Sequence, residues 1–177
     1  HVLDIDTVVI NNPNEDGEGE IWVTGPNVML GYFKDEAATK DAIDEEGYFK
    51  TGDYGKLDKN NVLYITGRKK NLIILSNGKN VYPEEIENYV MLVPYVAEVI
   101  VKGVKDENDK TVLLAEVFLN KDKVKEMEKA PDEAQLLTDI RIQTAKLPMY
   151  KQVTRIKIRD TEFEKTTTKK IKRFLIK

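Results

Sequence analysis

The sequence has 177 residues, 41% of them hydrophobic and 33% charged, so it can bury a core and is not compositionally disordered. Cysteine is absent and the single histidine is His1 at the terminus, which excludes disulfides, thiolate chemistry, histidine general-base catalysis and a histidine-rich zinc site. No apolar run approaches the roughly 18 residues of a membrane-spanning helix and no secretory leader is visible, so we expect a cytoplasmic protein.

The net charge of -3 hides two pieces of different character. Residues 1–64 hold 14 acidic and 5 basic side chains, whereas residues 65–177 hold 17 acidic and 23 basic ones. This asymmetry predicts two structural units. The chain also begins inside an apolar segment without an initiator Met, so we expect it to be part of a longer protein.

The first third of the chain has the pattern of short strands joined by turns. The predicted elements are strands at 8–10 and 20–24, a helix over 35–43, a strand ending near Lys50, a turn at Thr51-Gly52-Asp53, and a strand at 62–66 that is the second arm of a hairpin. Asn60 and Asn61 supply residues that tolerate the conformation of the hairpin turn.

From Gly67 onward the pattern mixes helices and strands. It predicts a buried strand at 72–75, a polar loop at 76–80, a helix from Pro83, a hairpin of strands 96–104 and 111–119, helices over 121–129 and from 131 to 147, a strand at 153–158, and a last short helix with Ile171, Phe174 and Leu175 on its apolar face. We therefore expect an α+β fold with a small, mainly antiparallel sheet and flanking helices.

Asp53 lies in the first of three segments that could carry chemistry. In Tyr48-Phe49-Lys50-Thr51-Gly52-Asp53, the glycine would let a ligand approach the backbone, and a fixed carboxylate can accept both hydroxyls of a ribose. The alternative is an ordinary turn with a solvated aspartate.

The second segment, Gly67-Arg68-Lys69-Lys70-Asn71, lies where the composition changes. The planar guanidinium of Arg68 suits phosphate or ribose oxygens, and a polar stretch at such a boundary can act as a hinge. The alternative is a basic surface turn beside a helix cap.

Residues 165–177 form the third segment, with six basic side chains and no acid. Such a tail can be a solvated end or a phosphate-binding arm for nucleic acid. A sharper hypothesis is that one lysine on a mobile segment reaches a reacting phosphate and stabilises the charge that grows in the transition state.

In this order and spacing, the segments resemble the later core motifs of the acyl-adenylate-forming superfamily, which includes acyl-CoA synthetases, peptide-synthetase adenylation domains and beetle luciferases. The matching stretches are Gly19 to Gly25 with Gly31-Tyr32-Phe33, Tyr48 to Asp53, Gly67 to Glu87, Leu147-Pro148-Met149-Tyr150, and the final motif around Lys170. The resemblance covers nearly the whole chain, and Leu75 to Pro83 is most similar to long-chain fatty acyl-CoA synthetases.

The resemblance implies that residues 1–67 are the β-rich end of a large N-terminal domain and that residues 68–177 are a mobile lid. It implies nucleotide binding by Asp53 and Arg68, a hinge at Lys70, a CoA-tunnel loop at Gly78, and Lys170 as the catalytic lysine, with no metal ligand among them. Two positions depart from the family pattern, because Glu164 replaces a proline and Lys169 a glycine. The reactive lysine could therefore be Lys169 or Lys170, and the register of the following residues favours Lys170.

By the same resemblance, the full-length parent is an ATP-dependent, AMP-forming fatty acid–CoA ligase of lipid metabolism. ATP with Mg²⁺, a fatty acid and CoA would be its substrates, the missing N-terminal domain its structural partner, and membrane association peripheral through the acyl substrate. We expect the fragment alone to be inactive. The alternatives are a peptide-synthetase adenylation domain or related adenylate-forming enzyme and, in another class, a basic-tailed module that binds nucleic acid or a membrane. An acidic chain without aromatic residues among the basic ones argues against nucleic acid.

Overall fold

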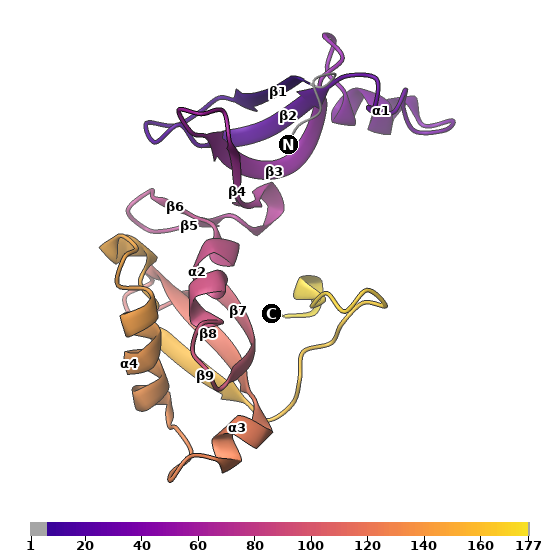
Figure 1. The fold of residues 1–177 in the computed structure, drawn as a ribbon. Coiled ribbons are helices and arrows are strands. Elements are labelled where there is room, and N and C mark those ends of the chain that lie inside the picture. Colours follow the sequence, from indigo (N-terminus) through magenta and orange to yellow (C-terminus); the bar gives the residue numbers. More distant parts are fainter. Residues whose placement is uncertain (1–6, 177) are drawn as a thin grey trace. The chain divides into compact units, whose positions relative to one another are not determined.

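The computed structural model describes residues 7–176 and consists of two compact units, His1–Asn71 and Leu72–Lys177 (Figure 1). The predicted boundary after residue 67 lies a few residues upstream of this division. His1 lies outside the described residues. Whether the second unit moves about this stretch as a lid stays a prediction.

The first unit is a four-stranded antiparallel sheet with the order β1-β2-β3-β4. Its strands are β1 (Thr7–Asn11), β2 (Gly19–Thr24), β3 (Phe49–Leu57) and β4 (Leu63–Arg68), with helix α1 (Glu36–Ala42) between β2 and β3 and the 3-10 turn η1 (Lys69–Asn71) after β4. Helix α1 begins where predicted because the Asp35 carboxylate accepts a hydrogen bond from the Ala38 N–H at 2.9 Å.

The predicted turn at Thr51-Gly52-Asp53 is wrong, because β3 runs through these residues. Trp22 of β2 lies opposite Lys50 and Glu20 opposite Tyr54, so the three residues between Lys50 and Tyr54 face only Ile21. The strand absorbs the extra residues as a β-bulge, with Gly52 at φ +70°. The bulge has the glycine and hydroxyl residues of a turn, which is why the sequence pattern suggested one.

The second unit has a three-stranded sheet in the order β7-β8-β9, together with a small pair of strands. Its elements are β5 (Ile73–Ile74), β6 (Asn80–Val81), α2 (Pro83–Val90), β7 (Val96–Lys105), β8 (Thr111–Leu119), α3 (Lys121–Lys125), α4 (Glu133–Gln143), β9 (Arg155–Arg159), and the 3-10 turns η2 (Met149–Lys151) and η3 (Arg173–Leu175). β7 and β8 pair antiparallel as predicted, and β9 joins β8 in parallel. The predicted α+β fold with mainly antiparallel sheets is confirmed.

Helices α2 and α4 contact each other, and they pack on β7 and β9 respectively to enclose the core (Figure 1). The predicted face of α2 is buried at Ile86 and Val90, and the face of α4 at Ile140 and Thr144. Apolar residues at helical spacing cover the sheet because burial of apolar area is the main favourable contribution to folding.

Three predictions for this unit are wrong in extent. The predicted strand at 72–75 shrinks to β5, whose Ile74 is 63% exposed, and α3 ends at Lys125 instead of Lys129. The last predicted helix is only the turn η3, where Phe174 is 80% exposed. Its apolar residues do not join the core, because the tail that carries them is attached to the unit largely by ion pairs.

Candidate functional site

The bulge in β3 fixes the position of Asp53. The Thr51 hydroxyl donates to the Ile21 carbonyl oxygen at 2.7 Å and accepts from the Asp53 N–H at 3.0 Å. This hydroxyl therefore links the bulged residues to β2, and the left-handed conformation of Gly52 turns the chain between them. Thr51 was not among the predicted site residues, although its place beside the glycine was a usable signal.

Asp53 and Arg68 were predicted from separate motifs, and the sheet brings them together. They lie opposite each other on β3 and β4, with the Arg68 Nε atom 2.9 Å from the Asp53 Oδ1 atom. Their side chains are 24% and 53% exposed, so both remain accessible to a ligand. A carboxylate beside a guanidinium can accept bonds from vicinal hydroxyls while the guanidinium donates to phosphate or ribose oxygens.

A second ion pair lies next to the first. The Lys69 ammonium is 2.9 Å from the carboxylate of Glu20, whose side chain is 8% exposed. This hydrogen bond raises the pKa of Lys69, because it stabilises the charged ammonium. The pair attaches the start of η1 to β2, and the next residue, Lys70, is exposed. Sequence reasoning placed Glu20 in a motif but assigned it no partner.

Gly78 lies in the turn that joins β5 to β6. Its N–H donates to the Leu75 carbonyl at 2.8 Å, and the Leu75 N–H donates to the Lys79 carbonyl at 3.0 Å. The glycine is at φ +77°, and no atom lies within 4 Å of a Cβ added there. The backbone conformation therefore favours glycine here, and the space beside its Cα atom is open.

Lys170 closes an exposed turn near the end of the second unit. The Thr166 N–H donates to the Lys170 carbonyl at 2.8 Å, the Lys169 N–H donates to the Thr166 carbonyl at 2.9 Å, and Lys165 pairs with Ile171. Lys169 has φ +62°, a conformation that glycine adopts most easily. This explains physically why a glycine can occupy the position before the lysine. This conformation agrees with the motif register that favours Lys170, and the choice between Lys169 and Lys170 stays a prediction.

Residues 85–170 match the family described as the AMP-binding enzyme C-terminal domain. Residues 85–170 are the C-terminal domain of an acyl-adenylate-forming ligase. The second unit, which contains them, is named the AMP-binding domain after this family. Among solved structures, o-succinylbenzoate CoA synthetase (MenE) from Bacillus subtilis in complex with the acyl-adenylate intermediate OSB-AMP is similar, with a TM-score of 0.79, 33% identity, and coverage of 98% of this chain and 34% of that chain.

The curated relatives that this chain matches are named as CoA ligases of different acid substrates. A 2-succinylbenzoate–CoA ligase from Bacillus licheniformis is 52% identical over 89 residues, which are 50% of this chain and 18% of the relative. Long-chain-fatty-acid–CoA ligase 1 from Homo sapiens is 44% identical over 99 residues, which are 56% of this chain and 14% of the relative. The chain therefore spans less than a fifth of either relative.

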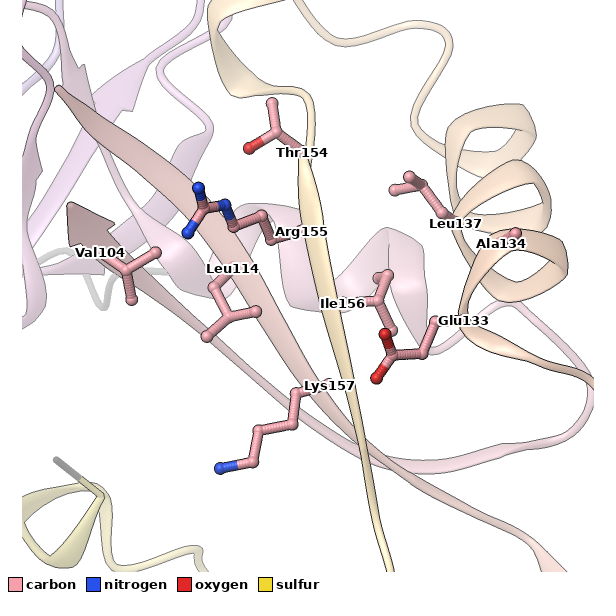
Figure 2. A pocket seen from close by; sticks show the side chains of 9 residues that line it. All are labelled: Val104, Leu114, Glu133, Ala134, Leu137, Thr154, Arg155, Ile156 and Lys157. Atoms are coloured by element: carbon pink, nitrogen blue, oxygen red, sulfur yellow. The ribbon is translucent and has the colours of Figure 1, made fainter. Parts of the chain in front are cut away.

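The AMP-binding domain also has an open hollow of about 740 Å³ between α4 and the end of the sheet (Figure 2). Leu137 and Ala134 of α4 line one side, and Leu114 and Arg155 of the sheet line the other. None of the predicted site residues lines this hollow. Within residues 7–176 no group of three or more acidic or histidine side chains gathers as a metal site, and no helix is long and apolar enough to span a membrane.

Proposed function

We propose that the full-length protein joins a fatty acid to ATP, releasing pyrophosphate and forming an acyl-adenylate, and then transfers the acyl group to CoA. The observation that carries the proposal is the pairing of Asp53 with Arg68 in one unit, together with the exposed Lys170 turn in the AMP-binding domain. The long-chain-fatty-acid–CoA ligases among the relatives support the choice of acid. We also propose a cytoplasmic location.

In this mechanism Asp53 accepts bonds from the ribose hydroxyls in both steps, and Arg68 donates to ribose or phosphate oxygens. Lys170 stabilises the negative charge that develops between the α-phosphate and the attacking carboxylate, which occurs in the first step only. Mg²⁺ enters as part of the nucleotide substrate, and no step is assigned to a metal ligand of this chain.

The second step needs a different arrangement of the same site. We propose that the AMP-binding domain rotates about Lys70, withdraws Lys170 and presents the Gly78 turn to the pantetheine arm of CoA. The exposed Lys70 in a short 3-10 turn supports a pivot there, because few packed contacts oppose rotation. The open space at Gly78 supports its place in the CoA tunnel.

We infer that this chain alone does not catalyse the reaction and that it needs further polypeptide to cover its first unit. Within residues 7–71, Ile21 is the only large apolar side chain that is buried. Leu30 and Phe33 are 102% and 88% exposed. A sheet with so little buried apolar area is typical of a surface that other polypeptide covers.

The half-reactions of the full-length protein test the role of Lys170. Lys170→Ala should lower the rate of acyl-adenylate formation by about 100-fold or more, because electrostatic stabilisation of a transition state has this magnitude. Thioester formation from supplied acyl-adenylate should remain unchanged. Pyrophosphate release and thioester absorbance measure the two rates, with Lys169→Ala as the matched control. Equal loss in both half-reactions would contradict the proposal.

The 52% sequence identity to a 2-succinylbenzoate–CoA ligase favours a second candidate for the acid substrate. Here the same site would activate an aromatic dicarboxylic acid instead of a fatty acid. Comparing kcat/KM of the full-length protein for palmitate and for 2-succinylbenzoate decides between them. A preference for 2-succinylbenzoate would remove the fatty acid assignment but leave the two-step chemistry in place.

A further inference from the structure

The turn that carries Lys170 is held on the AMP-binding domain from both sides. On its N-terminal side, Phe163 is 4% exposed and its N–H donates to the Glu98 carboxylate at 2.9 Å. The Arg159 guanidinium lies 4.3 Å from the centre of the Phe163 ring. The Lys165 ammonium forms an ion pair with the same Glu98 of β7. This stem of the turn is therefore attached to the sheet.

On the C-terminal side, the Arg173 guanidinium forms an ion pair with Glu87 of α2 and lies 3.8 Å from the Glu84 carboxylate. The other oxygen of Glu87 accepts a hydrogen bond from the Val101 N–H at 2.7 Å. Glu87 is thus bonded to β7 as well as to the tail. The second stem of the turn is attached to the same unit as the first, but through helix α2 instead of strand β7.

The two stems also contact each other. Lys165 pairs with Ile171, and the Lys172 N–H donates to the Glu164 carbonyl at 2.8 Å. Between these contacts, residues 166–170 are exposed. The Lys170 ammonium therefore projects from a closed turn whose base is fixed, while its own side chain remains accessible.

We expect the ion pair between Arg173 and Glu87 to be sensitive to loss of either partner. Burial raises the pKa of Glu87, because the carboxylate is largely removed from water. The charge of Arg173 opposes that rise. Removing Arg173 would leave a buried carboxylate without its compensating charge, which destabilises the local arrangement more than loss of an exposed pair does. An exposed pair, such as Lys172 with Glu164 at 3.8 Å, contributes little.

We propose that Arg173 and Lys165 are positioning residues, which hold the Lys170 turn rigidly on the AMP-binding domain through Glu87 of α2 and Glu98 of β7. The proposal rests on the catalytic role proposed above for Lys170. Its consequence is mechanical: because the turn moves with the domain, a domain rotation displaces Lys170 by a defined amount. In a loosely attached tail, the Lys170 ammonium would not be held at the reacting phosphate.

The test uses Arg173→Gln in the full-length protein. Acyl-adenylate formation should fall by about 10- to 100-fold, because a misplacement of about 1 Å has such effects on rate. The KM for ATP and the rate of thioester formation from supplied acyl-adenylate should not change. Backbone amides of residues 165–171 should exchange with deuterium faster, while those of β7 and β8 keep their protection, which shows that the domain stays folded.

Three further variants sharpen the test. Lys172→Gln removes a neighbouring charge of the same tail and should leave both readouts unchanged. Glu87→Gln keeps an acceptor for the Val101 N–H but loses the charge, so it should reproduce Arg173→Gln. Arg173→Lys should restore part of the activity.

Unchanged exchange over residues 165–171 in Arg173→Gln would overturn the proposal, as would equal loss in both half-reactions. The exchange readout does not depend on activity, so it separates this proposal from the function proposed above. If Lys170→Ala fails to separate the half-reactions, the proposed function is wrong. If Lys170→Ala separates them and Arg173→Gln leaves adenylate formation unchanged, only the positioning role is wrong.

Discussion

At the scale of single residues, Glu116 of β8 places a carboxylate in the sheet of the AMP-binding domain at 3% exposure. It is surrounded by cations from both neighbouring strands. The Lys102 ammonium of β7 lies 2.7 Å away, and on β9 the Arg159 guanidinium lies 3.1 Å away and the Lys157 ammonium 3.6 Å away. The Glu116 carboxylate therefore offsets the electrostatic repulsion among Lys102, Lys157 and Arg159.

Removing the Glu116 carboxylate should destabilise the domain. We expect Glu116→Ala to lower the free energy of unfolding by about 1–3 kcal/mol, because the half-buried Lys102 and Arg159 lose the buried carboxylate to which they bond. The control is Glu126→Ala on an exposed ion pair with Lys123, which should change stability by about 0.5 kcal/mol or less. Urea unfolding measures both. Equal effects of the two variants would contradict the assignment.

The same carboxylate should make stability depend on pH. Burial acts to raise the pKa of Glu116, but the hydrogen bonds and charges of Lys102 and Arg159 outweigh it and lower the pKa below its ordinary value of 4.5. A lowered carboxyl pKa means that the contribution to stability is present above pH 4.5 and is lost as the pH falls through the folded-state pKa. Glu116→Gln should therefore show a shallower loss of stability in acid than the unchanged chain.

At the scale of elements, the bulge in β3 decides the geometry of the proposed nucleotide site. Three residues of β3 face Ile21, and the strand stays paired because Gly52 adopts a left-handed conformation and Thr51 bonds to β2. Asp53 thereby reaches its place opposite Arg68. Regular pairing from Trp22 and Lys50 onward would shift the register by two residues and place Asp53 opposite Gly19.

Gly52→Ala tests the bulge. No atom lies within 4 Å of a Cβ at this position, so any destabilisation comes from backbone strain, about 1–2 kcal/mol for a residue with a side chain in this conformation. We expect the melting temperature of the full-length protein to fall, and the affinity for ATP to fall with it. Gly52→Asn should lose less, because asparagine tolerates this conformation better. A larger loss for asparagine than for alanine would contradict the explanation.

At the scale of the whole molecule, the two units differ in how much apolar surface they bury. The second unit contains a continuous core that includes Ile86, Val90, Leu136 and Ile140, each at 0% exposure. The first unit leaves many large apolar side chains exposed, such as Ile65 at 66%. The second unit therefore has the means to fold by itself, and the first does not.

Chains limited to each unit test this difference. Residues 72–177 alone should unfold cooperatively in urea, with a sigmoidal loss of far-ultraviolet circular dichroism. Residues 1–71 alone should show no cooperative transition, because Ile21 is the only large apolar side chain buried within residues 7–71. A cooperative transition of the first unit by itself would show that it needs no further polypeptide.

Much of the fold and of the site could be predicted from local patterns. Periodicity identified α2, α4 and the pairing of β7 with β8, because helical and strand spacings place apolar residues on one face. Residue chemistry indicated Asp53 and Arg68 as candidates, and the resemblance to the family indicated Gly78 and Lys170. The spacing of several motifs along the chain was specific enough to indicate the family that the comparisons then showed.

The sequence by itself therefore determined which residues are available for chemistry and which segments bury an apolar face. These features follow from propensity and periodicity, which are local properties of the chain. Only the tertiary structure decided that Thr51-Gly52-Asp53 is a bulge, that β9 runs parallel to β8, and that the last helix is a turn with Phe174 exposed. It also decided the pairs Lys69 with Glu20 and Arg173 with Glu87. Such contacts join residues 49 and 86 positions apart, and no local pattern records which distant charge a side chain will meet.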